Sequence, residues 1–346
     1  MKTGKIIAAI LFIVILFAGF IAWQIFGPTV NGGDKKFLYI RSNSNYTQVK
    51  DSLLADGYIN KALWLDKVAN YADYPTNVKP GKYKITKGMS VYSLIKKLRS
   101  GKQESVNLVI TKLRTREDLA KRISRSFEVD STSAINFLSN NDSLLPFNVD
   151  SNTVLTAVIP NTYTYFWTTP MDDIFQKLFK EEEKFWNDER TEKAKRHLLS
   201  EKQIYIIASI VEEETNMQDD KGKIASVYMN RLDKGMRLGA DPTVKFAMKD
   251  FGLKRIYHKH LEFDSPYNTY RNSGLPPGPI CTPSIKTIDA VLDAPKTDYL
   301  FFVARADLSG HSDFATNYTQ HLIYAKAYQN ALNELIKRKQ EKEAAQ

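Results

Sequence analysis

Hydrophobic residues follow three different patterns along this chain. From Ile6 to Phe26 they are almost continuous. At about 1.5 Å per residue, a helix of that length reaches roughly 30 Å, the thickness of the hydrocarbon core of a bilayer. Between residues 37 and 111 short apolar stretches alternate with polar ones, and from residue 159 onward longer helical patterns alternate with loops rich in Pro, Asn, Thr and Tyr. The fold class predicted from these patterns is α+β, with a transmembrane helix over residues 6–26, a small module over 37–111 and a larger domain over 159–346.

The apolar segment near the N-terminus is predicted to be an uncleaved membrane anchor. A secretory signal peptide usually has an apolar region of about 7 to 15 residues and a small-residue cleavage site, and neither feature fits here. Lys2 and Lys5 precede the segment, so the positive-inside rule keeps residues 1–5 in the cytoplasm and exports everything after Gly27. We therefore expect a single-pass protein of the plasma (inner) membrane whose catalytic part is periplasmic or otherwise extracytoplasmic.

The small module is predicted from strand and helix signals in short pieces. Ser90 is a candidate N-cap and Gly101 a candidate helix stop. The expected strands cover residues 37–40, 82–86 and 105–111, and the expected helices cover residues 46–55 and 91–99. Residues 112–158 contain a helix expected after Thr115 and a polar Ser-Asn-Asp stretch, and they are interpreted as a helical connector to the larger domain.

Composition narrows the class of protein. The 346 residues are 43% hydrophobic, enough for a buried core, and carry a formal net charge of +10. A basic surface suits an anionic partner such as lipid headgroups or a cell-wall polymer, whereas a nucleic-acid partner would contradict the exported location. The single cysteine, Cys281, excludes an internal disulfide and is expected to be a small buried residue.

The most apolar helix of the exported part ends in three consecutive carboxylates. Ser200 and Gln203 form a capping box, which predicts that the helix begins at Glu201. At 100° per residue, Glu214 shares a face with three apolar residues, whereas Glu212 lies on the side of Tyr205 and Ala208. Glu213 lies between these two sides. A carboxyl held against an apolar face loses hydration, so its pKa rises and it can act as a general acid near neutral pH. The alternative is a frayed, solvated helix end. The three apolar neighbours are Ile207, Ile210 and Val211.

Polar and aromatic residues after this helix are candidate ligands for sugars. Asp219 and Asp220 are predicted to cap a helix over residues 221–234, which carries Asn230. Asp241 precedes Pro242 and is also explained as a plain N-cap, which would leave Thr243 in an exposed first turn. The Tyr and Asn side chains of the Pro-rich loop 265–279 suit stacking on sugar rings and hydrogen bonding to hydroxyls, although the loop could be only a connector. The loop residues concerned are Tyr267, Asn268 and Tyr270.

Other site chemistries find little support in the sequence. His258 and His260 have i, i+2 spacing without the carboxylate and third ligand of a catalytic zinc centre. The sequence contains no Gly-x-Ser-x-Gly elbow, no Walker loop and no dinucleotide fingerprint. We expect neither a metal nor a cofactor.

Several ordered motifs run along the chain. They are residues 160–163 (PNTY), 208–215 (ASIVEEET), 225–232 (ASVYMNRL), 235–238 (GMRL), 241–244 (DPTV), 267–270 (YNTY), 274–280 (GLPPGPI), 295–303 (PKTDYLFFV) and 311–317 (HSDFATN). Together they closely resemble the YceG-like family of endolytic murein transglycosylases. The resemblance extends over nearly the whole chain, including the single N-terminal anchor, and the small module resembles the LysM-like subdomain of that family.

The resemblance implies an activity and assigns its acid. It implies cleavage of the β-1,4 bond between N-acetylmuramic acid and N-acetylglucosamine in nascent peptidoglycan, leaving a 1,6-anhydro end. The family's catalytic acid, the second Glu of a Glu-x-Glu-Thr motif, falls on Glu214, and Asn317 joins the candidate substrate-binding residues. Glu213 in the middle position departs from the usual pattern by adding a like charge beside the acid. Peptidoglycan synthases are candidate partners. A lysozyme-like hydrolase using Asp241 or Glu213, and a non-catalytic wall-binding scaffold, are the alternatives.

Overall fold

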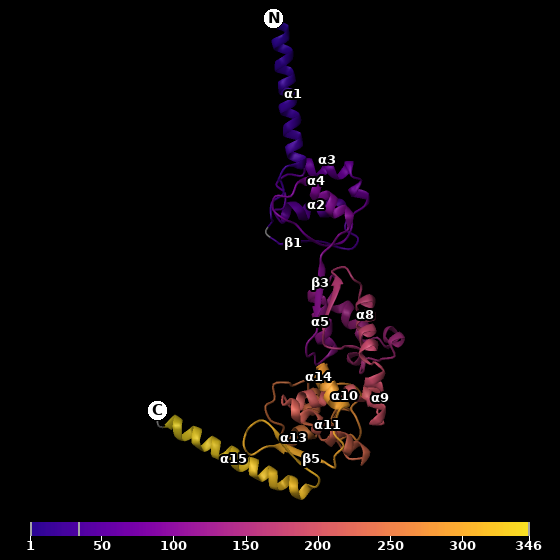
Figure 1. Cartoon of the computed structure of the whole chain (residues 1–346), viewed down its shortest axis with the longest axis vertical. Coiled ribbons are helices and arrows are strands. Elements are labelled where there is room, and N and C mark those ends of the chain that lie inside the picture. Colours follow the sequence, from indigo (N-terminus) through magenta and orange to yellow (C-terminus); the bar gives the residue numbers. More distant parts are fainter. Residues whose placement is uncertain (1, 34, 345–346) are drawn as a thin grey trace. The chain divides into compact units, whose positions relative to one another are not determined.

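The chain folds into two compact units. The computed structural model describes residues 2–33 and 35–344. Both units contain helices and strands (Figure 1), so the predicted mixture of helix and sheet is confirmed. Unit 1 comprises Met1–Leu108, Ile123–Asp130 and Thr164–Pro170, and unit 2 comprises Val109–Arg122, Ser131–Tyr163 and Met171–Gln346.

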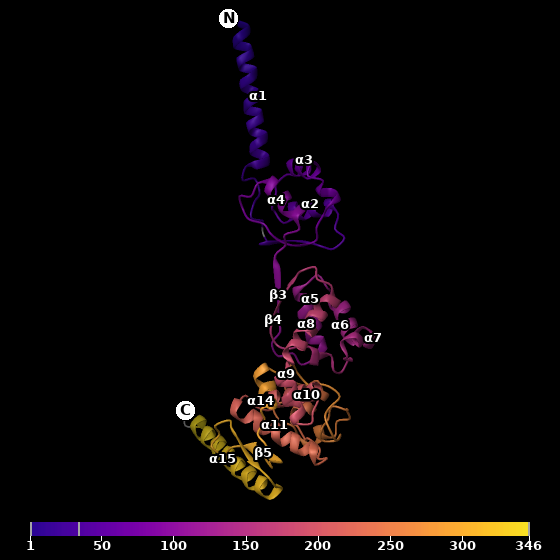
Figure 2. The same cartoon turned by 45° about the vertical axis from the view of Figure 1, so that its right-hand side comes forward.

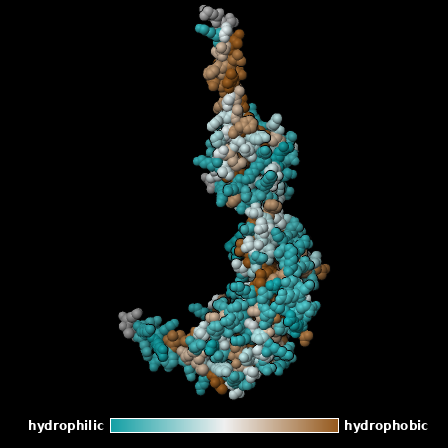
Figure 3. All heavy atoms as spheres, in the orientation of Figure 1, coloured by the Kyte–Doolittle hydropathy of each residue, from teal (hydrophilic) through white to brown (hydrophobic). Residues whose placement is uncertain are grey.

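Unit 1 begins with the apolar helix α1 (Lys2–Phe26). From Gly4 to Phe26 this helix is long and apolar enough to cross a membrane, and none of these residues is buried. Figure 3 shows the exposed hydrophobic surface along it. A helix that leaves so many apolar side chains exposed has no favourable environment in water, so its composition fits the predicted anchor.

The rest of unit 1 is a small module around one core. Strand β1 (Phe37–Ile40) pairs antiparallel with β2 (Gly81–Lys84), and the helices α2 (Tyr46–Ala55), α3 (Leu63–Tyr71) and α4 (Val91–Ser100) complete it with the short 3-10 turn Tyr74–Thr76 (Figure 2). Ser90 accepts a hydrogen bond from the backbone of Ser93, and Gly101 ends α4 with a left-handed φ of 69°. The predicted cap and stop are therefore confirmed.

Unit 2 is mainly helical. In this unit β5 (Phe301–Ala304) pairs antiparallel with β6 (Ser312–Ala315), whereas β3 (Ser105–Val109) and β4 (Thr162–Phe166), which pair with one another, lie mostly in unit 1. The helices of the remaining chain are α5 (Arg116–Ser126), α6 (Ser131–Ser139), α7 (Asn141–Leu144), α8 (Met171–Phe185), α9 (Asp188–Arg196), α10 (Glu201–Glu214), α11 (Gln218–Asp233), α12 (Asp241–Ala247), α13 (His258–Leu261), α14 (Ile285–Leu292) and α15 (Tyr318–Ala344), with 3-10 turns at Leu145–Phe147 and Val154–Ala157.

Helix α10 lies at the centre of the core of unit 2. Its residues from Ile204 to Val211 are all buried, and it packs against α9, α11, α12 and α14. Complete burial of each Ile or Val side chain contributes roughly 1.5–3 kcal/mol. Even Tyr205 is enclosed, because its hydroxyl donates to the carbonyl of Val158 at 2.7 Å. This packing fixes the end of α10, where the three acids lie.

Two predicted helix starts are wrong. Helix α11 begins at Gln218 after Met217, because the carboxylate of Asp220 does not cap it and instead accepts a hydrogen bond from the backbone of Ser312 at 2.7 Å. Helix α12 is preceded by Ala240, with Asp241 as its first residue. In both cases a long-range partner binds the carboxylate that local sequence assigned to a cap.

Candidate active site

The three acids lie on the last turn of a helix whose start was predicted correctly. Ser200 Oγ accepts from the backbone of Gln203 at 3.3 Å, and Gln203 Oε1 accepts from the backbone of Ser200 at 2.8 Å. Helix α10 then runs to Glu214, where Thr215 adopts an extended conformation. The capping box and the buried apolar residues therefore determine which direction each acid faces.

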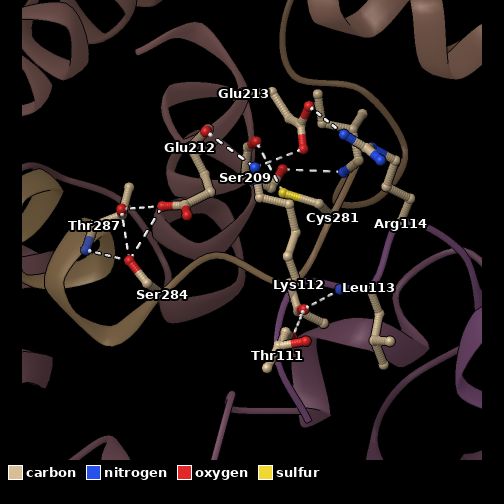
Figure 4. Close-up of polar contacts among 12 residues, drawn as sticks. Thr111, Lys112, Leu113, Arg114, Ser209, Glu212, Glu213, Cys281, Ser284 and Thr287 are labelled. Atoms are coloured by element: carbon tan, nitrogen blue, oxygen red, sulfur yellow. Dashed lines mark hydrogen bonds and ion pairs between the residues drawn. The ribbon is translucent and has the colours of Figure 1, made fainter. Parts of the chain in front are cut away.

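Glu212 is held in a buried ion pair. Its Oε2 lies 3.1 Å from Lys221 Nζ and accepts hydrogen bonds from the hydroxyls of Ser284 and Thr287 (Figure 4). Burial alone would raise the pKa of Glu212, but the hydrogen bonds from Thr287 and Lys221, together with the charge of Lys221, hold it below its ordinary value. This carboxylate links α10 to α11 and α14 and has a structural role.

Glu213 faces two cations from the segment before α5. Its Oε1 lies 3.0 Å from Lys112 Nζ, and its Oε2 lies 3.2 Å from an Arg114 guanidinium nitrogen. Figure 4 shows Glu213 and Arg114 pointing toward one another beside buried Cys281. Cys281 is fully buried, as predicted, and burial raises the pKa of its thiol. The negative charge of Glu213 is thus balanced by its neighbours.

Glu214 differs from the other two acids. Among the residues that the structure describes, no cation lies within ion-pair distance of its carboxylate. Its Oε1 accepts a hydrogen bond of 2.6 Å from the hydroxyl of Tyr228 on α11. Burial raises the pKa of Glu214 to about 7, opposed by the Tyr228 hydrogen bond. A carboxyl with a pKa near neutral can exchange its proton under ordinary conditions, which suits a group that first donates a proton and then accepts one.

Asp241 and Tyr270 form a hydrogen-bonded pair beside Glu214. The Tyr270 hydroxyl donates to Asp241 Oδ1 at 2.6 Å. The negative charge of Asp241 also helps to raise the pKa of Glu214, whereas the positive charges of Lys245 and Arg231 lower it. Asp241 is exposed and Tyr270 is partly buried. The structure therefore brings two predicted site residues into the electrostatic environment of the predicted acid.

Thr243 and Asn268 are fully buried, so the expectation of an exposed first turn at Thr243 is wrong. The Thr243 hydroxyl donates to the carbonyl of Ala240 at 2.7 Å and lies 2.8 Å from the hydroxyl of Thr269. The Asn268 amide donates to the carbonyls of Leu261 and Phe263, both at 2.8 Å. These contacts hold the loop after α13 against the start of α12 and thereby position Tyr270.

The remaining predicted site residues, Tyr267, Asn230 and Asn317, each have partners outside this group. Tyr267 packs its ring on Phe246, with centroids 4.7 Å apart. Asn230 donates to the carbonyls of Thr297 and Tyr299 at 2.8 and 2.9 Å, and at 100° per residue it lies on the opposite side of α11 from Tyr228. Asn317 is exposed and accepts from the backbone of Gln320 at 2.9 Å, near the start of α15.

A cavity of about 190 Å³ adjoins Glu213 and the first turns of α12. Phe246 and Phe251 supply aromatic surface, and Arg114 and Lys245 supply positive charge. Phe246 is the residue on which Tyr267 packs. The lining of the cavity also includes Glu213, Pro242 and Ile280.

Sequence reasoning missed Tyr228, the hydrogen-bond partner of Glu214. Tyr228 is buried and lies on α11, 14 residues beyond the acid. A tyrosine in a helical apolar pattern is normally interpreted as a core residue, so only the packing of α10 on α11 shows its second role. Within the described residues, no group of three or more His, Cys, Asp or Glu side chains is arranged to hold a metal ion.

The fold and the acid-bearing helix define a member of the YceG-like family, to which this chain belongs. The sequence profile of that family matches residues 38–327. The fold is also similar to the crystal structure of a YceG-like protein from Listeria monocytogenes, with a TM-score of 0.55, 27% identity, and coverage of 82% of this chain and 97% of that one.

Two curated relatives carry the name endolytic murein transglycosylase. The Bacillus subtilis protein is 38% identical over 169 residues, which are 48% of this chain and 45% of that protein. The Streptococcus pneumoniae D39 protein is 27% identical over 325 residues, covering 84% of this chain and 58% of that protein. The chain thus spans about half the length of the curated relatives that it matches.

Proposed function

We propose that this chain is a membrane-anchored endolytic lytic transglycosylase of peptidoglycan. It would cleave the β-1,4 bond between N-acetylmuramic acid and N-acetylglucosamine in nascent strands and leave 1,6-anhydro-muramyl ends, which terminates elongation. The observation that carries the proposal is the environment of Glu214, a carboxyl with a pKa raised by burial to about 7 and a single tyrosine partner. The names of the two curated relatives support it.

The chemistry needs only one carboxyl. Ordinary glycosidases use two, one as acid and one as nucleophile or base. Here the neutral Glu214 protonates the glycosidic oxygen as the bond to C1 of the muramyl residue breaks. The C6 hydroxyl of the same residue attacks C1, and the Glu214 carboxylate accepts the C6 proton. The acid is thereby regenerated and no water is consumed.

Of the proposed substrate ligands, those near Glu214 have the best support. Tyr270 and Asp241 form a pair whose charge acts on the acid. Tyr267, together with Phe246, offers aromatic surface on which a sugar ring can stack. Thr243 and Asn268 support this group from within the protein, because both are fully buried. Asn230 and Asn317 would contact sugars farther along the strand.

The proposed architecture follows the predicted division of the chain. A LysM-like module occupies residues 37–111, a helical connector 112–158 and the transglycosylase domain 159–346. The strand and helix order of unit 1 and the exposed apolar surface of α1 support the module and the anchor. The positively charged Lys2 and Lys5 in the first turns of α1 favour a cytoplasmic N-terminus and an extracytoplasmic catalytic part. Peptidoglycan synthases remain proposed partners.

Product analysis tests this function. The full chain is incubated with uncrosslinked glycan strands, and the products are identified by mass spectrometry. We expect new anhydro-muramyl ends. Products heavier by one water at each new end would identify a hydrolase, and undigested strands would identify a wall-binding scaffold; either result would contradict the proposal.

Replacing Tyr228 by Phe is expected to shift the pH dependence of the reaction. The Tyr228 hydroxyl stabilises the ionised form of Glu214, so its removal raises the pKa of that carboxyl further. Since the acid form starts the reaction, the alkaline limb of the rate profile should move up by about one pH unit, the equivalent of one charge-assisted hydrogen bond.

Tyr205→Phe is the matched control for this measurement. The Tyr205 hydroxyl donates to the carbonyl of Val158, and the residue is equally buried. The control should leave the alkaline limb in place. An unshifted limb in the Tyr228→Phe enzyme would show that this hydroxyl does not govern the titrating acid.

A further inference from the structure

Positive charge is concentrated in the small module of unit 1. Residues 28–108 carry 14 Lys and Arg and six Asp and Glu, a net charge of +8 within a chain whose total is +10. A module of this charge is attracted to anionic surfaces such as lipid headgroups over a distance of about one Debye length. The arrangement of its exposed residues determines which side of the module can make such a contact.

The module is joined directly to the end of α1. Ile25 packs against the module core, and Phe26 lies against Tyr92 of α4 with ring centroids 5.3 Å apart. The backbone of Gly27 donates to the carbonyl of Trp23 at 2.7 Å, which closes the last turn of the helix. If α1 spans a bilayer, its end at Phe26 places Tyr92 at the boundary between hydrocarbon and headgroups.

Helices α3 and α4 form the part of the module nearest α1, whereas β1 lies on the far side (Figures 1 and 2). Along α3, Leu63, Lys67 and Tyr71 follow one another at intervals of four residues and share one exposed face. Leu63 is 59% exposed and Tyr71 is 90% exposed. Exposed apolar side chains that gather on one face can mark an interaction site, unlike those scattered singly over a surface.

Helix α4 continues the same combination of aromatic and basic residues. Tyr92, Lys96 and Arg99 lie on one face at intervals of four and three residues. Among the described residues, neither Lys96 nor Arg99 has a carboxylate within ion-pair distance. Residues of both helices line a cavity of about 400 Å³, among them Val68, Tyr71, Tyr92, Ile95, Lys96 and Arg99.

We infer that this face of α3 and α4 binds the headgroups of anionic phospholipids in the membrane that holds α1. Tyr71 and Tyr92 lie at headgroup depth, where Tyr is enriched in membrane proteins, and Lys67, Lys96 and Arg99 bind the lipid phosphates. The inference rests on the proposed anchoring of α1. Its consequence is that the module stays at the membrane surface.

Site-specific labelling of the full chain tests the inference. The only native cysteine, Cys281, is buried with a raised thiol pKa, so an introduced cysteine is labelled selectively. Tyr71→Cys carries an environment-sensitive fluorophore, and the protein is reconstituted in bilayers containing phosphatidylglycerol and a lipid with a nitroxide headgroup. We expect quenching at residue 71. Arg41→Cys, an exposed position just after β1, is the control that should remain unquenched.

Charge reversal identifies the ligand. Lys67→Glu, Lys96→Glu and Arg99→Glu together should abolish quenching at residue 71, and so should replacement of phosphatidylglycerol by phosphatidylcholine. The matched triple variant Lys36→Glu, Arg41→Glu and Lys82→Glu changes the charge by the same amount on the β1–β2 side. Quenching at residue 71 should persist in this variant. Quenching that persists without anionic lipid, or equal loss in both triple variants, would overturn the inference.

A third label separates this inference from the anchoring itself. Gly19 lies within α1, and a side-chain carbon added there would have no other group within 4 Å, so Gly19→Cys should be quenched by a nitroxide on the acyl chain. A quenched residue 19 with an unquenched residue 71 would refute lipid binding by the module and leave the anchor intact. An unquenched residue 19 would refute the anchor.

Discussion

Glu214→Gln is expected to lower the formation of anhydro-muramyl ends by roughly 10³-fold or more, because one residue supplies both proton transfers and general acid–base catalysis contributes about 10²- to 10⁴-fold. Gln keeps the size of Glu and can still accept the hydrogen bond from Tyr228. It has no proton to donate at the pH of the reaction. Mass spectrometry of digested glycan strands measures the loss.

The fold of the Glu214→Gln enzyme should remain intact. The pKa of Glu214 in the folded chain, about 7, lies above the ordinary value of 4.5. Its contribution to stability is therefore fully present below pH 4.5 and is lost as the pH rises through 7. Since Gln never ionises, the variant should be more stable than the wild type above pH 7, by roughly 1–3 kcal/mol after allowance for solvent screening.

Glu213→Gln is the control for catalysis. It removes a charge from the neighbouring position, where Lys112 and Arg114 balance it. Most of the activity should survive this change. Activity retained by Glu214→Gln and lost by Glu213→Gln would move the catalytic acid to residue 213.

Glu212→Ala is expected to cost roughly 3–5 kcal/mol of unfolding free energy, the usual effect of breaking a buried ion pair. The side chains of Glu212 and Lys221 are only 14% and 8% exposed. Removal of the carboxylate leaves the Lys221 ammonium buried without a counter-charge, and the hydroxyls of Ser284 and Thr287 lose their acceptor. Calorimetry of unit 2 in the full chain should show a fall in Tm of about 10 °C.

Two further variants separate the ion pair from general damage to α10. Glu213→Ala removes an acid whose cationic partners are more than one third exposed, so it should cost about 1 kcal/mol or less. Glu212→Leu combined with Lys221→Met replaces both charges by apolar groups and should recover much of the lost stability. A double variant no more stable than Glu212→Ala would show that hydrogen bonding, rather than the unpaired charge, governs the loss.

Elements defined by local signals could be predicted from the sequence. The capping box at Ser200 and the stop at Gly101 each depend on residues within a few positions, and the structure has both. The helical wheel also separated Glu214 from Glu212, because the face of a helix is fixed by its periodicity. These successes share one property: the residues that determine the outcome are close in the sequence.

Where the predictions from sequence were wrong, contacts between residues far apart in the chain determine the structure. Asp220 and Asp241 both look like N-caps, yet their carboxylates accept hydrogen bonds from Ser312 and Tyr270, 92 and 29 residues away. Thr243 is buried because Thr269, in another loop, packs on it. No local pattern reveals such partners, and the same limitation concealed Tyr228.

Titration of the Glu214 carboxyl tests the central claim most directly. The side-chain carboxyl carbons of glutamate are labelled with ¹³C, and the Glu214→Gln variant identifies the signal that belongs to residue 214. The account predicts a midpoint near pH 7, set by the burial of this carboxyl. A midpoint near 4.5, the ordinary value for glutamate, would contradict it, because the group would then be ionised when the glycosidic oxygen needs its proton.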